Sequence, residues 1–343
     1  MPVALQPDTL SSSILPAFNR KLRDNFFTST VAFELFMGLV ERQDGGAYIQ
    51  DQIMYNQSPQ ANVWPGGVAT ASADFIGNTT SATYNPIYYL GAIGIPDTFA
   101  ILNQGQGMIV DLIAGQYQQM LMSLVQVIGQ DLYGDGTPRN GIPTLLGLNA
   151  ICTSGADPGG GPYAGISRVG SYGSFKAPTG PAPWWNANVL TINGGSQTIW
   201  QGSVNTGSST VSSYQAYFAF MLSATLGMYR PLAFLCDLLT YQGYGNLVVQ
   251  TVRQTPMEGV LRQGAKALTF ADCPIIADNQ CPSGSIYSVN DLLKWMIWRN
   301  GAFVETPWRQ PSNALVNIKY VVLVNALTHE RPNTMSVMTG ITG

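Results

Sequence analysis

The strongest periodic pattern of apolar residues lies between Ile101 and Thr137 and predicts one long α-helix. Apolar residues recur there at three- and four-residue spacing, which places them on one face of a helix. They are Ile109, Leu112, Ile113, Met120, Leu121, Leu124, Val125, Ile128 and Leu132. We expect a helix from Met108 to Tyr133, roughly 40 Å long at about 1.5 Å per residue, with Gly134 in the left-handed conformation that closes many helices.

The only charged residues of this helix are Asp111 and Asp131. A long helix with so little charge must be packed along most of its length. Two interpretations stay open at this point. The helix is either the core helix of a large globular domain or a spine along one edge of a flat building block.

Residues 46–95 show a different pattern, the alternation typical of β-strands. Residues 47–55 (AYIQDQIMY) predict one strand, and residues 81–95 (SATYNPIYYLGAIGI) predict a second. The intervening residues 56–77 contain the prolines and glycines of a turn region. The segment therefore predicts a long two-stranded hairpin. Because an isolated two-stranded ribbon is only marginally stable in water, we expect it to lie on a partner subunit.

The remaining segments mix helical and strand patterns without regular alternation, which favours an α+β fold. The helical patterns are residues 208–230 and 237–250, and the strand patterns are residues 232–236, 266–270, 273–278 and 317–327. Two apolar segments, residues 25–40 and 292–299, fit either a helix or an extended strand. Residues 138–205 are rich in Gly and Pro but contain three Trp, so we expect an ordered surface loop there.

The amino-acid composition predicts that neighbouring molecules cover much of the surface. Only 10 % of residues are charged while 45 % are hydrophobic, against a typical charged fraction of about a quarter. The hydrophobic fraction excludes a disordered chain, and a solitary soluble protein depends on more surface charge than this. The net charge of −3 and the pI near 5.1 argue against a nucleic-acid-binding role.

The sequence predicts neither a membrane span nor a secretory signal. No apolar run approaches the ~20 residues that cross a bilayer, and the first residues lack a basic segment followed by an apolar one. The cysteines Cys152, Cys236, Cys273 and Cys281 form no CxxC pair. Without a secretory signal they are expected to be reduced and buried, although Cys273 and Cys281 are close enough in sequence to pair.

The residues that usually carry chemistry are missing or wrongly spaced. His329 is the only histidine, which excludes a two-histidine zinc site. The sequence has no G-x-S-x-G, and residues 105–110 lack the third glycine of a dinucleotide loop. Residues 131–142 fail as a calcium loop at Tyr133 and Ile142. We therefore expect no catalytic residue, no metal and no cofactor, although motifs alone do not exclude a hydrolase that uses only carboxylates.

A set of segments, taken in order along the chain, resembles the major capsid protein of tailed bacteriophages. These segments are LPAFNRKLRDNFFTSTVAFELF (15–36), YIQDQIMYN (48–56), DLYGDGT (131–137), GLNAI (147–151), YAGISR (163–168), CPIIADNQCPSGSIYSVN (273–290) and NALVNIKYVVLVN (313–325). The resemblance implies an HK97-like α+β capsid fold. Its parts would be an N-terminal arm (1–45), an extended hairpin loop (46–95), a peripheral domain with the spine helix (96–207), an axial domain (208–291) and a return to the peripheral domain (292–343).

The resemblance further implies a subunit of an icosahedral shell of hexamers and pentamers that encloses double-stranded DNA without sequence-specific binding. The implied partners are further copies of the chain, a portal protein, a separate scaffolding protein because the arm begins almost at Met1, and optionally a decoration protein. The implied location is the virion capsid, assembled in the host cytoplasm with no membrane. An encapsulin-type compartment and, from another class, a β-rich enzyme or adhesin remain alternatives.

The resemblance also directs attention to residues that would contact neighbouring subunits. We expect Arg20 and Arg23 to pair with carboxylates of a neighbour, the alternative being a solvated basic segment. The expected aromatic contacts are Tyr48, Trp64, Tyr84, Tyr88 and Tyr89, with packing inside the subunit as the alternative for the last three. Residues 46–95 contain no lysine, so a lysine–asparagine cross-link at the hairpin, as in some relatives, is not expected.

Overall fold

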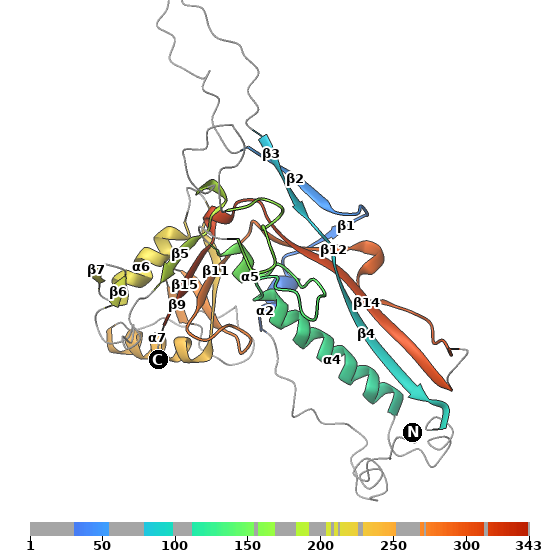
Figure 1. Ribbon diagram of the computed structural model, residues 1–343. Coiled ribbons are helices and arrows are strands. Elements are labelled where there is room, and N and C mark those ends of the chain that lie inside the picture. The colour runs from blue at the N-terminus through green and yellow to red at the C-terminus, as the bar shows by residue number, and fades with distance from the viewer. Residues whose placement is uncertain are drawn as a thin grey trace, which may run out of the picture.

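The computed structural model describes residues 31–54, 79–98, 112–153, 157–168, 183–191, 204–206, 209–211, 213–225, 229–251, 268–270, 272–311 and 315–341. These residues form two larger β-sheets, two two-stranded sheets and several helices, which agrees with the expected mixture of helix and sheet. Figure 1 shows one sheet beside the long helix α4, and the other on the opposite side of the molecule with the helices α6 and α7.

The long helix α4 spans Leu112–Leu132 and confirms the periodic pattern of the sequence. It packs along the strand β4 (Ile87–Pro96), as Figure 1 shows. Its expected first residues, 108–111, lie outside the described residues. The prediction that Gly134 adopts the left-handed conformation is wrong, because its φ is not positive. Residues 147–150 instead fold back onto the end of the helix, where the carbonyl of Gly134 accepts the backbone N–H groups of Gly147 and Ala150.

The first sheet is built around one long strand, β14 (Val316–His329). The other strands are β1 (Val40–Gln43), β12 (Leu293–Trp298), β13 (Val304–Glu305) and β4, and the sheet order is β1-β12-β14-β13 with β4 also paired to β14. Residues 316–325 of β14 pair with β4, while residues 325–329 pair with β12. The strand expected at 317–327 is confirmed, and residues 292–299 are a strand rather than a helix.

The hairpin is shorter than the sequence suggested. β2 (Ile49–Met54) pairs with β3 (Thr79–Tyr84) in antiparallel register, with Ile49 opposite Tyr84. The second strand expected at 81–95 is divided at Asn85-Pro86, because proline has no N–H to donate to a ladder. Beyond that point β4 pairs with β14 and not with β2. The expected turn region lies outside the described residues.

The second sheet has the order β5-β15-β11-β8-β10-β9. Its strands are β5 (Asn188–Thr191), β15 (Ser336–Thr339), β11 (Ile286–Asn290), β8 (Pro231–Cys236), β10 (Cys273–Ala277) and β9 (Leu268–Phe270). The strands expected near 232, 266 and 273 are confirmed. β5 and β15 come from outside residues 208–291, so the sheet extends beyond the expected domain boundaries.

The remaining elements are short, apart from two helices. The helix expected at 208–230 is α6 (Ser213–Ser223), and the one expected at 237–250 is α7 (Leu238–Thr251). Residues 209–211 belong instead to β7, which pairs with β6 (Val204–Thr206). The other short elements are α2 (Val31–Met37), α5 (Leu148–Ile151), η2 (Pro183–Trp185), η3 (Arg299–Gly301) and η4 (Pro332–Thr334).

A buried carboxylate joins three parts of the fold. Asp278 follows β10 and is 1 % exposed. It accepts hydrogen bonds from the backbone N–H of Ala32 in α2 at 2.7 Å, from the hydroxyl of Tyr133 after α4 at 3.2 Å, and from the backbone N–H of Gln280. Since a buried carboxylate is costly without donors, these bonds fix the start of α2 against the end of α4 and the second sheet.

Candidate assembly surfaces

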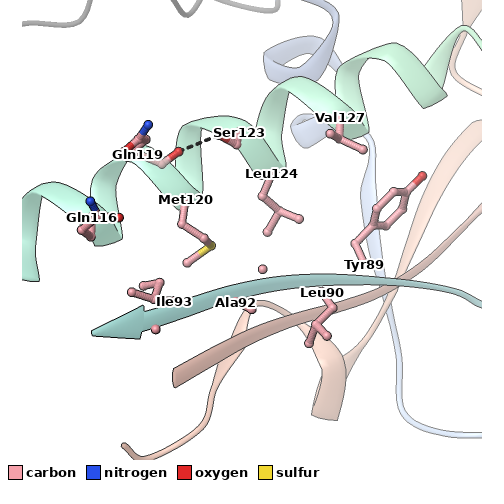
Figure 2. A pocket seen from close by; sticks show the side chains of 12 residues that line it. Tyr89, Leu90, Ala92, Ile93, Gln116, Gln119, Met120, Ser123, Leu124 and Val127 are labelled. Atoms are coloured by element: carbon pink, nitrogen blue, oxygen red, sulfur yellow. Dashed lines mark hydrogen bonds between the residues drawn. The ribbon is translucent and has the colours of Figure 1, made fainter. Parts of the chain in front are cut away.

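The strand β4 has two chemically different faces. Its residues are alternately buried and exposed along its length, as expected where one face of a sheet is covered. Tyr89 and Ile93 are buried on the side of α4. Leu90 points to the other side of the strand, away from Met120 and the helix (Figure 2). α4 therefore covers one face of this part of the sheet.

The other face is apolar and open. Tyr88 and Leu90 are 68 % and 61 % exposed. The strand register places Leu90 opposite Val322 and Ala92 opposite Tyr320, and Val322 in turn lies opposite Val304. We call these six residues, Tyr88, Leu90, Ala92, Val304, Tyr320 and Val322, the open sheet face. None of them is charged; four are exposed, and Tyr320 and Val322 are half-buried between them. An exposed apolar surface of this kind is typical of a protein–protein interface.

The hairpin adds further exposed apolar side chains, one at its base and one at the far end of β2. Tyr48 is 51 % exposed and Met54 is 82 % exposed. The sequence prediction of contacts with neighbours includes Tyr48 and Tyr88 but not Met54, Leu90 or the rest of the open sheet face. The alternation along β4 was the signal that could have found Leu90, because it lies two residues from Tyr88 on the same face.

Tyr84 is packed inside the chain. It is 2 % exposed, and its hydroxyl donates a hydrogen bond to the carbonyl of His329 at 2.9 Å. Its ring meets that of Tyr163 edge-on, with centroids 5.8 Å apart. Burial raises the pKa of Tyr84 well above its usual range, so the hydroxyl stays a donor. Tyr84 thus joins the hairpin to the end of β14.

Tyr89 is also packed inside the chain and is 8 % exposed. Its hydroxyl donates to Asp131 at 2.8 Å, and Asp131 forms an ion pair with Arg139 at 2.8 Å. Burial, followed by the charge of Asp131, raises the pKa of Tyr89 above its usual range. Tyr84 and Tyr89 therefore take the alternative role weighed for them, packing within the subunit, and they leave little surface for a neighbour. Arg20, Arg23 and Trp64 lie outside the described residues.

A buried arginine at the end of residues 163–168 joins this segment to α5 and η2. Arg168 is 0 % exposed and donates to the carbonyls of Trp185, Ala150 and Ile151 at 3.0, 2.8 and 2.9 Å. Its guanidinium also lies 5.4 Å from the centre of the Tyr163 ring. Burial lowers the pKa of Arg168 from its usual value.

The segment around this arginine is therefore part of the core and not only the surface loop that the sequence suggested. Trp185 is itself 0 % exposed and belongs to the larger hydrophobic cluster. Asp157 completes the arrangement by accepting from the backbone N–H of Arg168 at 2.6 Å and from the hydroxyl of Ser167 at 2.7 Å. The only sequence signal was a lone charge at the end of the apolar segment YAGISR (163–168).

The side chains that most often bind metals or act as nucleophiles were located in the described part of the chain. No group of three His, Cys, Asp or Glu side chains there could hold a metal ion. All four cysteines are free and buried, and burial raises the pKa of each, so none presents a reactive thiolate. No described helix is both long enough and apolar enough to cross a membrane.

The single histidine is held in its neutral form. His329 is 0 % exposed, and its Nδ1 accepts the backbone N–H of Arg331 at 3.0 Å. Its Nε2 therefore carries the proton and donates to the side-chain oxygen of Asn290 at 2.9 Å. Burial lowers the pKa of His329 to about 3.

The buried, neutral His329 predicts that the folded chain loses stability as the pH falls. The folded-state pKa lies below the unfolded value near 6.5, so unfolding takes up a proton at intermediate pH. The contribution to stability is complete above pH 6.5 and declines as pH falls from there towards 3, by up to about 1.4 kcal/mol per pH unit. Urea unfolding at pH 6.5 and 5.5 should show a larger loss for the natural chain than for His329→Gln. Equal losses would contradict a buried neutral imidazole.

Comparisons with known proteins identify the fold. No protein-family model matches the sequence, and no curated protein matches it. Among solved structures, the chain is similar to the capsid of cyanophage A-1(L), with 15 % identity over 99 % of this chain and 100 % of that one, at a TM-score of 0.64. The capsid protein of cyanophage P-SCSP1u matches with 13 % identity over 96 % and 94 % of the two chains, at a TM-score of 0.57.

An encapsulin is among the similar structures. The SrpI encapsulin of Synechococcus elongatus PCC 7942 matches with 13 % identity over 98 % of this chain and 96 % of that chain, at a TM-score of 0.54. The chain therefore has the fold of tailed-phage major capsid proteins, the HK97-like fold, over nearly its whole length. The encapsulin shares this fold, so the fold alone does not decide what a shell of this chain would enclose.

Proposed function

We propose that this chain is the major capsid protein of a tailed bacteriophage, forming hexamers and pentamers of an icosahedral shell that encloses double-stranded DNA. The observation that carries the proposal is the match to cyanophage and other phage capsids over 94 % or more of both chains. The open sheet face and the low charge of the chain support it, because both require covering by neighbours.

The proposed partners follow from this role. Copies of the chain contact one another through the open sheet face, which includes Tyr88, and through Tyr48. Trp64 contributes from the hairpin, and Arg20 and Arg23 pair with carboxylates of a neighbour. A separate scaffolding protein, a portal protein and optionally a decoration protein complete the assembly in the host cytoplasm. Many moderate contacts between symmetric copies add through multivalency.

The second candidate is the shell of an encapsulin-type compartment, favoured by the likeness to the SrpI encapsulin. The two candidates differ in what they enclose. Electron micrographs of purified particles, followed by nuclease treatment and extraction, should show shells containing protected double-stranded DNA. A co-purified enzyme and no DNA would support the compartment instead. A monomer near 36.9 kDa in size-exclusion chromatography would exclude both shells.

The shell is expected to be held together without covalent bonds between copies. Residues 46–95 contain no lysine, and all four cysteines are buried inside the chain. Mature particles denatured in hot detergent without reductant should give one gel band near 36.9 kDa. A ladder that persists in reductant would reveal a cross-link formed by another group.

A further inference from the structure

An open groove of about 580 Å³ separates β2 from the body of the subunit. Residues 50–54 of β2 line one side of it, and residues of the body, among them Trp184 and Glu330, line the rest. In the described part of the chain, the hydrogen bonds from the hairpin to the body come from Thr83 and Tyr84 of β3. β2 is therefore the side of the hairpin whose distance from the body can change.

Asp51 places a carboxyl group on the apolar face of β2. The alternation along the strand puts Asp51 on the same face as Ile49 and Ile53, which both pack with the larger hydrophobic cluster. Its partner in β3, Ala82, is 0 % exposed. In the described part of the chain, no hydrogen-bond donor reaches the half-buried carboxyl. A negative charge here is costly, because the carboxylate loses water without gaining a partner.

Glu330 adds a like charge to the same groove. It is exposed and follows directly after β14. Burial first, and then the negative charge of Glu330, raise the pKa of Asp51 above its ordinary value. Arg331 also lines the groove, and its guanidinium lies 5.2 Å from the centre of the Tyr229 ring. Two carboxyl groups thus oppose the close packing of β2 whenever both are charged.

The other titratable groups beside the groove are uncharged at neutral pH. Burial lowers the pKa of His329 to about 3 and raises the pKa of Tyr84 above its usual range. The 3₁₀-helix η2 contributes only Trp184 and Trp185. Asp51 is therefore the group through which a proton can change the charge balance of the groove.

We propose that protonation of Asp51 controls how closely β2 packs against η2 and residues 330–333. The protonated carboxyl does not repel Glu330 and can donate a hydrogen bond across the groove, whereas the carboxylate can do neither. This control goes beyond the proposed function, because it belongs to the single subunit.

The direction of the pH dependence follows from the raised pKa of Asp51. Close packing raises this pKa above the ordinary value near 3.8, so the closely packed hairpin binds the proton more tightly. The stabilisation of close packing is complete below the ordinary pKa and is lost as the pH rises through the raised one. We therefore expect β2 to lie closest to the body in mild acid and to move away from it at neutral pH.

Hydrogen–deuterium exchange of residues 49–54 in the full chain tests the proposal. Asp51→Asn imitates the protonated carboxyl, because the amide is neutral and donates hydrogen bonds. At pH 7.5, the amides of β2 should exchange roughly threefold or more slowly in this variant than in the natural chain, compared in the same state of assembly. The difference should narrow at pH 4.5, where the natural carboxyl takes up its proton.

Glu330→Gln removes the repelling charge and leaves Asp51 in place, so it should slow the same exchange by a smaller factor. It keeps the test decisive if Asp51→Asn does not fold. The matched control is Asp272→Asn, which removes an exposed carboxylate outside the groove and should leave residues 49–54 unchanged. Exchange at pH 7.5 that is equal in the natural chain and the groove variants, or faster in the variants, would overturn the proposal. Shell formation is not the readout, so the proposed function is tested separately.

Discussion

Replacing Tyr88 and Leu90 with serine is expected to abolish shell assembly and leave the subunit folded. Both side chains are mostly exposed on the open sheet face, so the isolated subunit loses little packing. Their burial between subunits would stabilise each contact by about 25 cal/mol per Å² of apolar surface. Because the contact repeats in every copy, even a moderate loss at each one prevents closure.

The measurement is sucrose-gradient sedimentation combined with circular dichroism. The double serine variant should remain as subunits or small oligomers with the natural helical signal. The matched variant, Tyr88→Phe with Leu90→Met, keeps the apolar area and should form shells. Normal shells from the serine variant would show that the open sheet face is not an interface.

Replacing Arg168 with methionine is expected to prevent the subunit from folding. The methionine keeps much of the volume but removes every N–H that serves the carbonyls of Ala150, Ile151 and Trp185. Each buried acceptor left without a donor costs about 1–3 kcal/mol. Three of them approach the whole stability of a typical domain, about 5–15 kcal/mol.

Two further variants separate this effect from the loss of a positive charge. Arg299→Met removes an exposed ion pair with Asp44 and should cost at most about 1 kcal/mol. Arg168→Lys keeps the charge but cannot reach three carbonyls with one ammonium group, so it should also be strongly destabilised. Soluble yield and urea midpoints report the difference. If Arg168→Met had the same urea midpoint as Arg299→Met, the three hydrogen bonds of Arg168 would not be needed for the stability of the fold.

The sequence predicted the elements whose pattern is local. The periodic run 112–132 became α4, and the apolar run 317–327 became β14, because each buries one continuous face. It could not predict the partner of each strand. The alternation of residues 81–95 continues across Pro86, so nothing local showed that β4 leaves the hairpin to pair with residues more than two hundred positions away.

The candidate contacts show the same limit. Alternation separates Tyr88 from Tyr89, yet it does not say which face meets the subunit's own helix. The answer depends on Asp131, which lies in α4 and accepts the hydroxyl of Tyr89. The role of Arg168 could not be predicted from the sequence for a related reason. Its acceptors are backbone carbonyls, which leave no trace in the identity of the residues that carry them.

The position of Asp278 has a mechanical consequence. Residues 1–30 enter the described fold at α2, whose first turn is held by this carboxylate together with the end of α4. Tension that reaches the first turn of α2 would therefore pass through this carboxylate to Tyr133 and to the end of β10. In the proposed shell, a load on α2 would be shared by these elements of the subunit.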